Sequence, residues 1–435
     1  MVGAKVGAKV NVVCALNCLS TRRNEQSTKV LSLRTKVART KKRSQQITYA
    51  TNSEEIPFKV RAAQALVDVV PGEAGLRLLS SAFPEKIRTT FAGLMSSYKT
   101  QMLIALGDEA LASKATTFIF KDMVKAYAGQ LLGNPYEFPS YHRAIRSPYD
   151  YFQMANMYIG SLIDFDRSIL RNPERWSEIQ SQLDDGQNVI LLANHQSEGD
   201  AAFIPLLTEV SHPGLGQRVT YVAGDRVVTD LLAKPFSMGK DLLCVHSKKH
   251  MNDVPEDKAK KMKQNLSTIK EMQRLLNQGG MLIWIAPAGG RDRRKADGTL
   301  APDRFDPQAI DMMRKLGTKA SAAKTHFYPL AMATYDIMPP PATSEKSIGE
   351  ERVVNYTGVG LSLGEAIDVS SNGPWNQSKN ESTDEATALA NFVLAKVTEE
   401  YNLIKDCNVP GVGATPLPEN SIRPPRAPSV PVFSS

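Results

Sequence analysis

Five short apolar runs, separated by stretches with helical spacing, constrain the fold of this chain more than any other feature. The runs are Val189 to Ala193, Val219 to Ala223, Leu242 to His246, Met281 to Ala286 and His326 to Thr334. Alternation of strand-like runs with helices implies a largely parallel sheet. The sequence therefore predicts an α/β fold, in which a large domain holds a mixed, largely parallel sheet flanked by helices.

Helical spacing dominates the region before the first of these strands. Apolar residues recur every three or four positions between residues 54 and 135, and the breaks at Gly107 and Gly133 are expected to end helices. We expect a small helical-bundle domain over residues 53–135 and an α/β domain over residues 136–407. Within the latter, residues 258–277 and 383–405 have the pattern of helices. Residues 408–435 contain seven prolines and no periodicity, so we expect a mostly disordered tail.

The positive charge of the chain is concentrated at its N-terminus. The formal net charge is +8, but residues 1–52 hold eleven Lys and Arg against the single acid Glu25, so the remaining chain carries −2. A basic, acid-poor, Ser- and Thr-rich segment is typical of an organelle transit peptide. A secretory signal built on Val10 to Leu16 is the alternative, although Asn11 interrupts it. Without the leader, the net charge no longer favours a nucleic-acid partner.

Cysteine content and hydropathy indicate the compartment. Only Cys244 and Cys407 lie outside the leader, so no disulfide framework is expected and a reducing compartment is favoured. No apolar run approaches the ~20 residues that cross a bilayer. We expect a soluble protein with at most peripheral membrane contact.

The first of the five runs leads directly into a possible catalytic pair. His195 and Asp200 follow Ala193 closely. On one helix, side chains five residues apart would diverge by about 140°, and on one strand they would face opposite surfaces. A strand-to-helix turn is the arrangement that brings them together. There the carboxylate can orient the imidazole, whose other nitrogen can accept a proton from an attacking hydroxyl. A histidine that merely caps the turn is the alternative.

Cationic residues follow two more of the predicted strands. Arg291 and Arg293 come after Gly289-Gly290, and Lys249 and His250 come after the run that ends at His246. Ligands collect at the carboxyl ends of parallel strands, and paired guanidinium groups suit a phosphate dianion. Each segment alone could be an exposed charged turn. Together with His195 and Asp200 they indicate a site for a phosphorylated alcohol.

At this point the sequence resembles the soluble plastid-type glycerol-3-phosphate acyltransferases, within the glycerolipid acyltransferase family that has a His-x4-Asp motif. The resemblance runs from about residue 142 to 413 and more loosely into the preceding helical region. Its segments are His142 to Arg146, Asn194 to Asp200, Val222 to Val227, Lys234 to Ser237, Ser247 to Met251, Trp284 to Arg293 and Asp336 to Pro341. Gly199-Asp200-Ala201 stands where the family often has Ala-Asp-Pro, and Ala288 replaces a common serine.

The resemblance implies a reaction and roles for these residues. His195 is implied as the catalytic base, Asp200 as its partner, and Lys249, His250, Arg291 and Arg293 as the glycerol 3-phosphate site. The implied reaction moves a fatty acyl group from acyl carrier protein, or from acyl-CoA, to the sn-1 hydroxyl, giving 1-acyl-sn-glycerol 3-phosphate. It implies no metal, no cofactor and no covalent acyl-enzyme, and a location in the plastid (chloroplast) stroma.

Three alternatives remain open from the sequence. A 1-acylglycerol-3-phosphate acyltransferase also carries Asn-His-Gln-Ser before the acid, but the segment Gly289 to Arg293 differs from that branch. A non-catalytic module that keeps the fold and binds anions or lies at a membrane surface is the second. The third concerns the carrier: the lysines at 258, 260, 261 and 263 are a candidate docking patch for an acidic acyl carrier protein, or simply a solvated helix face.

Overall fold

The computed structural model describes residues 58–81, 83–132, 136–247, 251, 254–340, 352–377, 383–407 and 417–434. The predicted leader, residues 1–52, lies outside the described residues. Within the described part, nine strands form one sheet in the order β1-β5-β4-β6-β3-β7-β8-β2-β9. The strands are β1 (Tyr141–His142), β2 (Ile169–Arg171), β3 (Asn188–Ala193), β4 (Val219–Gly224), β5 (Asp241–Val245), β6 (Leu282–Ile285), β7 (Thr325–Ala333), β8 (Gly360–Leu363) and β9 (Ser421–Ile422).

The predicted parallel core of the sheet is confirmed. β5, β4, β6, β3 and β7 are neighbours and all run in the same direction. These are the five apolar runs of the sequence. β1 pairs with β5, and β8 with β7, in the antiparallel sense, while β2 is parallel to β8. The sheet is therefore mixed and largely parallel, as predicted.

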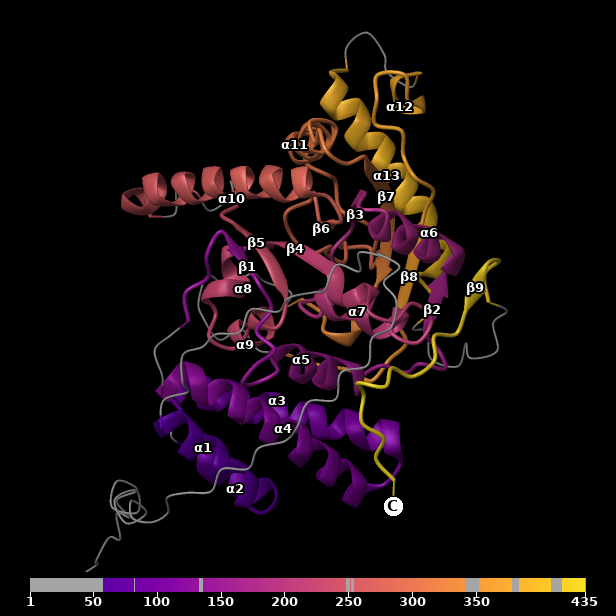
Figure 1. Cartoon of the computed structure of the whole chain (residues 1–435). Coiled ribbons are helices and arrows are strands. Elements are labelled where there is room, and N and C mark those ends of the chain that lie inside the picture. Colours follow the sequence, from indigo (N-terminus) through magenta and orange to yellow (C-terminus); the bar gives the residue numbers. More distant parts are fainter. Residues whose placement is uncertain are drawn as a thin grey trace, which may run out of the picture. The chain divides into compact units, whose positions relative to one another are not determined.

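Helices cover both faces of the sheet (Figure 1). The α-helices are α1 (Phe58–Val69), α2 (Gly72–Ser80), α3 (Glu85–Leu106), α4 (Glu109–Leu132), α5 (Tyr151–Gly160), α6 (Pro173–Asp184), α7 (Asp200–Thr208), α8 (Asp225–Thr229), α9 (Lys234–Met238), α10 (Lys258–Gln278), α11 (Pro307–Thr318), α12 (Pro374–Gln377) and α13 (Glu385–Ile404). Alternate residues of β3 divide between the two faces: Val189 and Leu191 join the core with α3 to α7, whereas Ile190 and Leu192 join the core with α10, α11 and α13.

The N-terminal helices pack together as expected for a bundle (Figure 1). α3 ends at Leu106 and is capped by Gly107, which adopts φ 68°, and α4 ends at Leu132, so the predicted break points hold. Phe91 and Phe120 of the bundle belong to the same continuous core as Leu191 of β3. The domain boundary between residues 135 and 136 stays a prediction, because this core runs across it.

The expectation of a disordered tail is wrong for residues 417–434. β9 pairs with β2 at the edge of the sheet, and Ala427 and Val430 are buried in the core. Proline prevents helix formation but is compatible with edge strands and extended segments. The absence of periodicity therefore excluded regular amphipathic elements and could not reveal this packing. Residues 408–416 lie outside the described part.

Candidate active site

The turn between β3 and α7 places His195 and Asp200 side by side. β3 is buried along its whole length, and Asp200 is the first residue of α7. Nδ1 of His195 lies 2.7 Å from Oδ2 of Asp200. The strand-to-helix turn expected from the spacing is therefore the one observed.

Hydrogen bonds fix the Asp200 carboxylate from both sides. Its Oδ2 also accepts the backbone N–H of Gln196 at 2.8 Å, and its Oδ1 accepts the hydroxyl of Thr334 at 2.6 Å. Asp200 is 2% exposed, whereas the side chain of His195 is 27% exposed. The carboxylate therefore holds the imidazole with its proton on Nδ1. Among the described residues, none hydrogen bonds to Nε2 of His195, so that nitrogen can take a proton.

Aromatic rings from two neighbouring strands support His195. The ring of Trp284 in β6 lies edge-on to the imidazole, with the centroids 5.8 Å apart, and Tyr221 of β4 packs against Trp284 at 5.7 Å. Because β4 and β6 end at the same edge of the sheet as β3, their side chains meet beneath the turn. This packing limits rotation of the imidazole away from Asp200.

A buried polar network joins the turn between β3 and α7 to the segment after β6. Asn194 Nδ2 donates to Oδ2 of Asp292 at 2.8 Å, and the backbone N–H of Asp292 donates to the carbonyl of His195 at 2.6 Å. Asn194 also exchanges hydrogen bonds with the backbone of Met332 in β7. Burial raises the pKa of Asp292 to about 6. The network sets the position of the cationic segment relative to His195.

The structure brings one predicted phosphate ligand directly to the turn between β3 and α7. Gly289 adopts φ 67°, so the chain reverses after β6, and Arg291 then lies 3.4 Å from Glu198. Only 11% of the Arg291 side chain is exposed. Arg293 is half-buried on the same segment. Lys249 and His250 lie outside the described residues, so their predicted role stays a prediction.

Three residues of the site were not predicted from the sequence. Thr334, at the end of β7, holds Asp200, and Gln196 accepts the backbone N–H groups of Thr334 and Tyr335. Arg352 binds Glu198 at 2.9 Å and Asp230 at 3.1 Å. Polar residues at a strand end were a signal for Thr334. Nothing in the local sequence marks Arg352, because its partners are more than 100 residues away.

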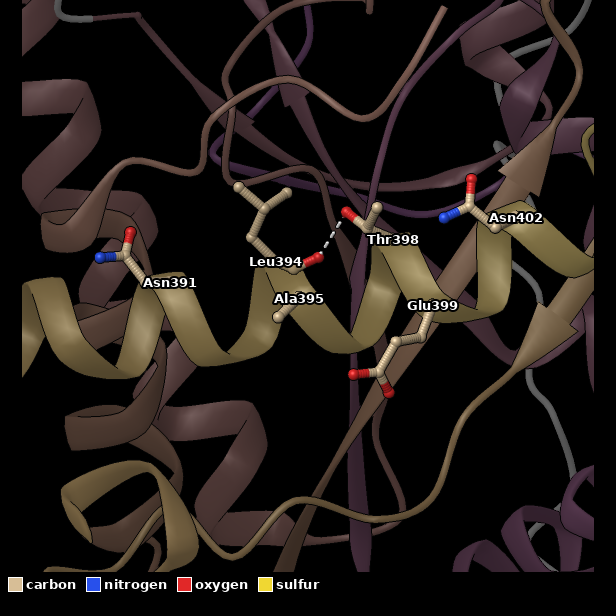
Figure 2. A pocket seen from close by; sticks show the side chains of 6 residues that line it. All are labelled: Asn391, Leu394, Ala395, Thr398, Glu399 and Asn402. Atoms are coloured by element: carbon tan, nitrogen blue, oxygen red, sulfur yellow. Dashed lines mark hydrogen bonds between the residues drawn. The ribbon is translucent and has the colours of Figure 1, made fainter. Parts of the chain in front are cut away.

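A concave region along α13 has different chemistry. Figure 2 shows a hollow along one face of α13. It is lined by Asn391, Leu394, Ala395, Thr398, Glu399 and Asn402. The lining holds one carboxylate and no cationic side chain or histidine. It is therefore suited neither to a phosphate nor to proton transfer.

Comparisons with known proteins agree with this geometry. A family model described as Acyltransferase matches residues 173–333, which include the turn between β3 and α7 and the segment after β6. The chain is 41% identical over 347 residues to the chloroplastic glycerol-3-phosphate acyltransferase of Arabidopsis thaliana, covering 79% of this chain and 73% of that protein. It is 40% identical over 354 residues to the corresponding chloroplastic protein of Spinacia oleracea, covering 80% and 71%. Identity at this level over most of both chains shows that the chain belongs to the glycerol-3-phosphate acyltransferase family.

Proposed function

We propose that this glycerol-3-phosphate acyltransferase uses His195 as a general base on the sn-1 hydroxyl of glycerol 3-phosphate. The observation that carries the proposal is the 2.7 Å contact between His195 Nδ1 and Asp200. It leaves Nε2 to accept the hydroxyl proton, while the carboxylate stabilises the resulting imidazolium. General base catalysis of this kind contributes roughly 10²–10⁴-fold to the rate.

The reaction then proceeds by direct acyl transfer. The hydroxyl oxygen bonds to the thioester carbonyl carbon of the donor as its proton passes to Nε2 of His195. The tetrahedral intermediate collapses with cleavage of the carbon–sulfur bond, and the departing sulfur takes the proton back from Nε2. The products are 1-acyl-sn-glycerol 3-phosphate and the free thiol of the carrier. Orientation of the two substrates supplies the rest of the acceleration.

Cationic residues beside the turn would hold the phosphate of the acceptor. Arg291 lies at the turn and Arg293 follows on the same segment, and we assign Lys249 and His250 to the same group. Guanidinium groups bind phosphate with paired charge-assisted hydrogen bonds, each of which contributes about 1.5–3 kcal/mol. A phosphate held there fixes the acceptor while leaving its hydroxyls near His195.

We assign acyl carrier protein as the donor and the first half of α10 as its docking surface. Asn265 of α10 hydrogen bonds to both backbone groups of His246, directly after β5. Residues 258–264 therefore extend on the order of 10 Å beyond the carboxyl edge of the sheet. This docking surface carries four lysines and two exposed apolar side chains: Lys258, Lys260, Lys261, Lys263, Met262 and Leu266. An acidic carrier would bind such a surface beside the site.

Charge reversal tests the docking surface. Lys258→Glu/Lys260→Glu should slow transfer from acyl carrier protein at least about tenfold and leave transfer from acyl-CoA within about threefold. Lys270→Glu, at an exposed position about three turns further along α10, is the control. Equal losses with both donors would contradict docking, and would fit the alternative in which these lysines are a solvated face.

The location that we propose is the plastid stroma. The relatives reported above are chloroplastic by name, and residues 1–52 have the composition of a transit peptide. None of the described helices is long and apolar enough to cross a membrane. Import of the chain into isolated chloroplasts, followed by N-terminal sequencing of the processed form, tests the assignment. Retention outside the organelle would contradict it.

The decisive experiment measures product formation with purified protein. Radiolabelled acyl groups on acyl carrier protein should pass to glycerol 3-phosphate with the unmutated chain and not with His195→Ala. His326→Ala is the control, because His326 is half-buried at the amino end of β7, away from the carboxyl ends of the parallel strands. Turnover that survives in His195→Ala would contradict the assignment of the base. Use of 1-acylglycerol 3-phosphate in place of glycerol 3-phosphate would support the 1-acylglycerol-3-phosphate acyltransferase alternative.

A further inference from the structure

Four charged side chains beside the catalytic turn form one continuous ion-pair chain. Arg291 lies 3.4 Å from Oε1 of Glu198, and Oε2 of Glu198 accepts from Nε of Arg352 at 2.9 Å. Nη2 of Arg352 in turn lies 3.1 Å from Asp230. All four side chains are at most 27% exposed. The chain joins the segments after β3, β6 and α8 to the segment before β8.

Glu198 is the unusual member of this chain. It sits between His195 and Asp200 in sequence and contacts the guanidinium group that is proposed to bind phosphate. A carboxylate in that place competes with a phosphate dianion for Arg291, and it repels the dianion. The closer contact of Glu198 is with Arg352, at 2.9 Å, and not with Arg291, at 3.4 Å. Arg352 therefore determines how strongly the Glu198 carboxylate pairs with Arg291.

Arg352 is itself fixed from two directions. Its second partner, Asp230, is held by the backbone N–H groups of Leu232 and Ala233. Two residues after Arg352, the backbone N–H of Val354 donates to the hydroxyl oxygen of Ser97 in α3. The N-terminal helices thus brace the segment that carries Arg352. An anchored guanidinium group can draw the Glu198 carboxylate away from the phosphate site without moving itself.

We propose that Arg352 is a positioning residue for glycerol 3-phosphate: it draws Glu198 toward itself, so that a phosphate can displace Glu198 from Arg291. The proposal rests on the phosphate-binding role of Arg291 given above. Without Arg352, Glu198 retains Arg291 as its cationic partner among the described residues and blocks it. Removing the Glu198 charge as well removes the carboxylate that competes with the phosphate for Arg291. A loss that a second substitution reverses distinguishes this role from a general structural one.

Steady-state kinetics on the full chain test the proposal. Arg352→Gln should raise the KM for glycerol 3-phosphate at least about tenfold, while kcat and the KM for the acyl donor stay within about threefold. Arg352→Gln/Glu198→Gln should return the KM to within about threefold of the unmutated protein. Calorimetric titration with glycerol 3-phosphate should show the same loss and recovery of affinity without turnover. If Arg352→Gln fails to fold, Arg352→Lys with and without Glu198→Gln replaces it.

The control is Arg175→Gln. Arg175 also bridges two carboxylates, Glu365 and Glu400, but it lies away from the carboxyl ends of the parallel strands. It should leave every KM unchanged. An unchanged KM in Arg352→Gln, or a raised KM that Glu198→Gln does not reverse, overturns the proposal and leaves the phosphate role of Arg291 intact. If Arg291→Gln itself leaves the KM unchanged, the proposed phosphate site fails, and the role of Arg352 fails with it.

Discussion

Asp200→Asn isolates the charge of the catalytic carboxylate from its hydrogen bonds. With its amide oxygen toward His195 and Gln196, the substituted side chain accepts the same two N–H groups, and its NH₂ donates to the Thr334 hydroxyl, which can rotate to accept. The substitution therefore preserves the shape of the turn. It removes the negative charge that stabilises the imidazolium formed when His195 takes the proton.

The expected fall in kcat follows from the distance between the Asp200 carboxylate and the His195 imidazolium. At about 4 Å and an effective dielectric constant of about 20, a carboxylate stabilises an imidazolium by about 4 kcal/mol. That energy corresponds to about a 10³-fold fall in kcat, because about 1.36 kcal/mol is tenfold. The KM for glycerol 3-phosphate should stay within about threefold, since the interaction strengthens only when the proton moves.

The assay is steady-state transfer of a labelled acyl group to glycerol 3-phosphate at saturating donor. Thr334→Val is the matched variant, because it removes one hydrogen bond to Asp200 and keeps the charge, and it should cost about tenfold to a hundredfold in kcat. Near-ultraviolet circular dichroism checks that both variants keep the fold. If Asp200→Asn retains more than about a tenth of kcat, the charge of Asp200 does not stabilise an imidazolium on His195.

Three further predictions concern the surroundings of this pair. Arg293→Gln should raise the KM for glycerol 3-phosphate about 10- to 100-fold through loss of a charge-assisted bond, and an unchanged KM would place Arg293 outside the phosphate site. Burial raises the pKa of Asp292 to about 6, so the folded state binds this proton more tightly than the unfolded state, and stability from this group falls as pH rises from about 4 to 6. The free energy of unfolding of Asp292→Asn, measured with urea, should therefore rise by about 2 kcal/mol relative to that of the unmutated protein between about pH 4.5 and 7.5. A difference between the two proteins that does not change with pH would contradict the raised pKa. Val430→Asp should lower the free energy of unfolding by about 2–4 kcal/mol, because it places a charge in the core. Val432→Asp, at a position 76% exposed, should change the free energy of unfolding little. Equal effects of the two substitutions would mean that the tail does not pack as described.

Local patterns were sufficient for the parallel core and for the contact between His195 and Asp200. Each predicted strand run is continuous and buried on both faces, which makes it readable without knowledge of its partners. The pair was readable for a similar reason. The spacing of His195 and Asp200 excludes one helix or one strand, and the apolar residues on either side require a turn between them.

The short antiparallel strands were beyond such reading. β1 and β9 have two residues each, and they become strands only because β5 and β2 offer backbone partners. The tail packs for the same reason: Val430 fits against Gly160, whose missing side chain leaves room for it. No periodicity in residues 417–434 encodes that contact.

The order of the main elements and the turn that brings His195 to Asp200 could be predicted from the sequence alone, because hydrophobic spacing, glycine stops and short motifs act over a few residues. Only the tertiary structure decided which distant groups complete the site. Thr334 reaches Asp200 from β7, and Arg352 reaches Glu198 across 154 residues of chain. Such contacts depend on strand order and on the packing of α3 against the segment before β8, and neither is written in any local stretch of sequence.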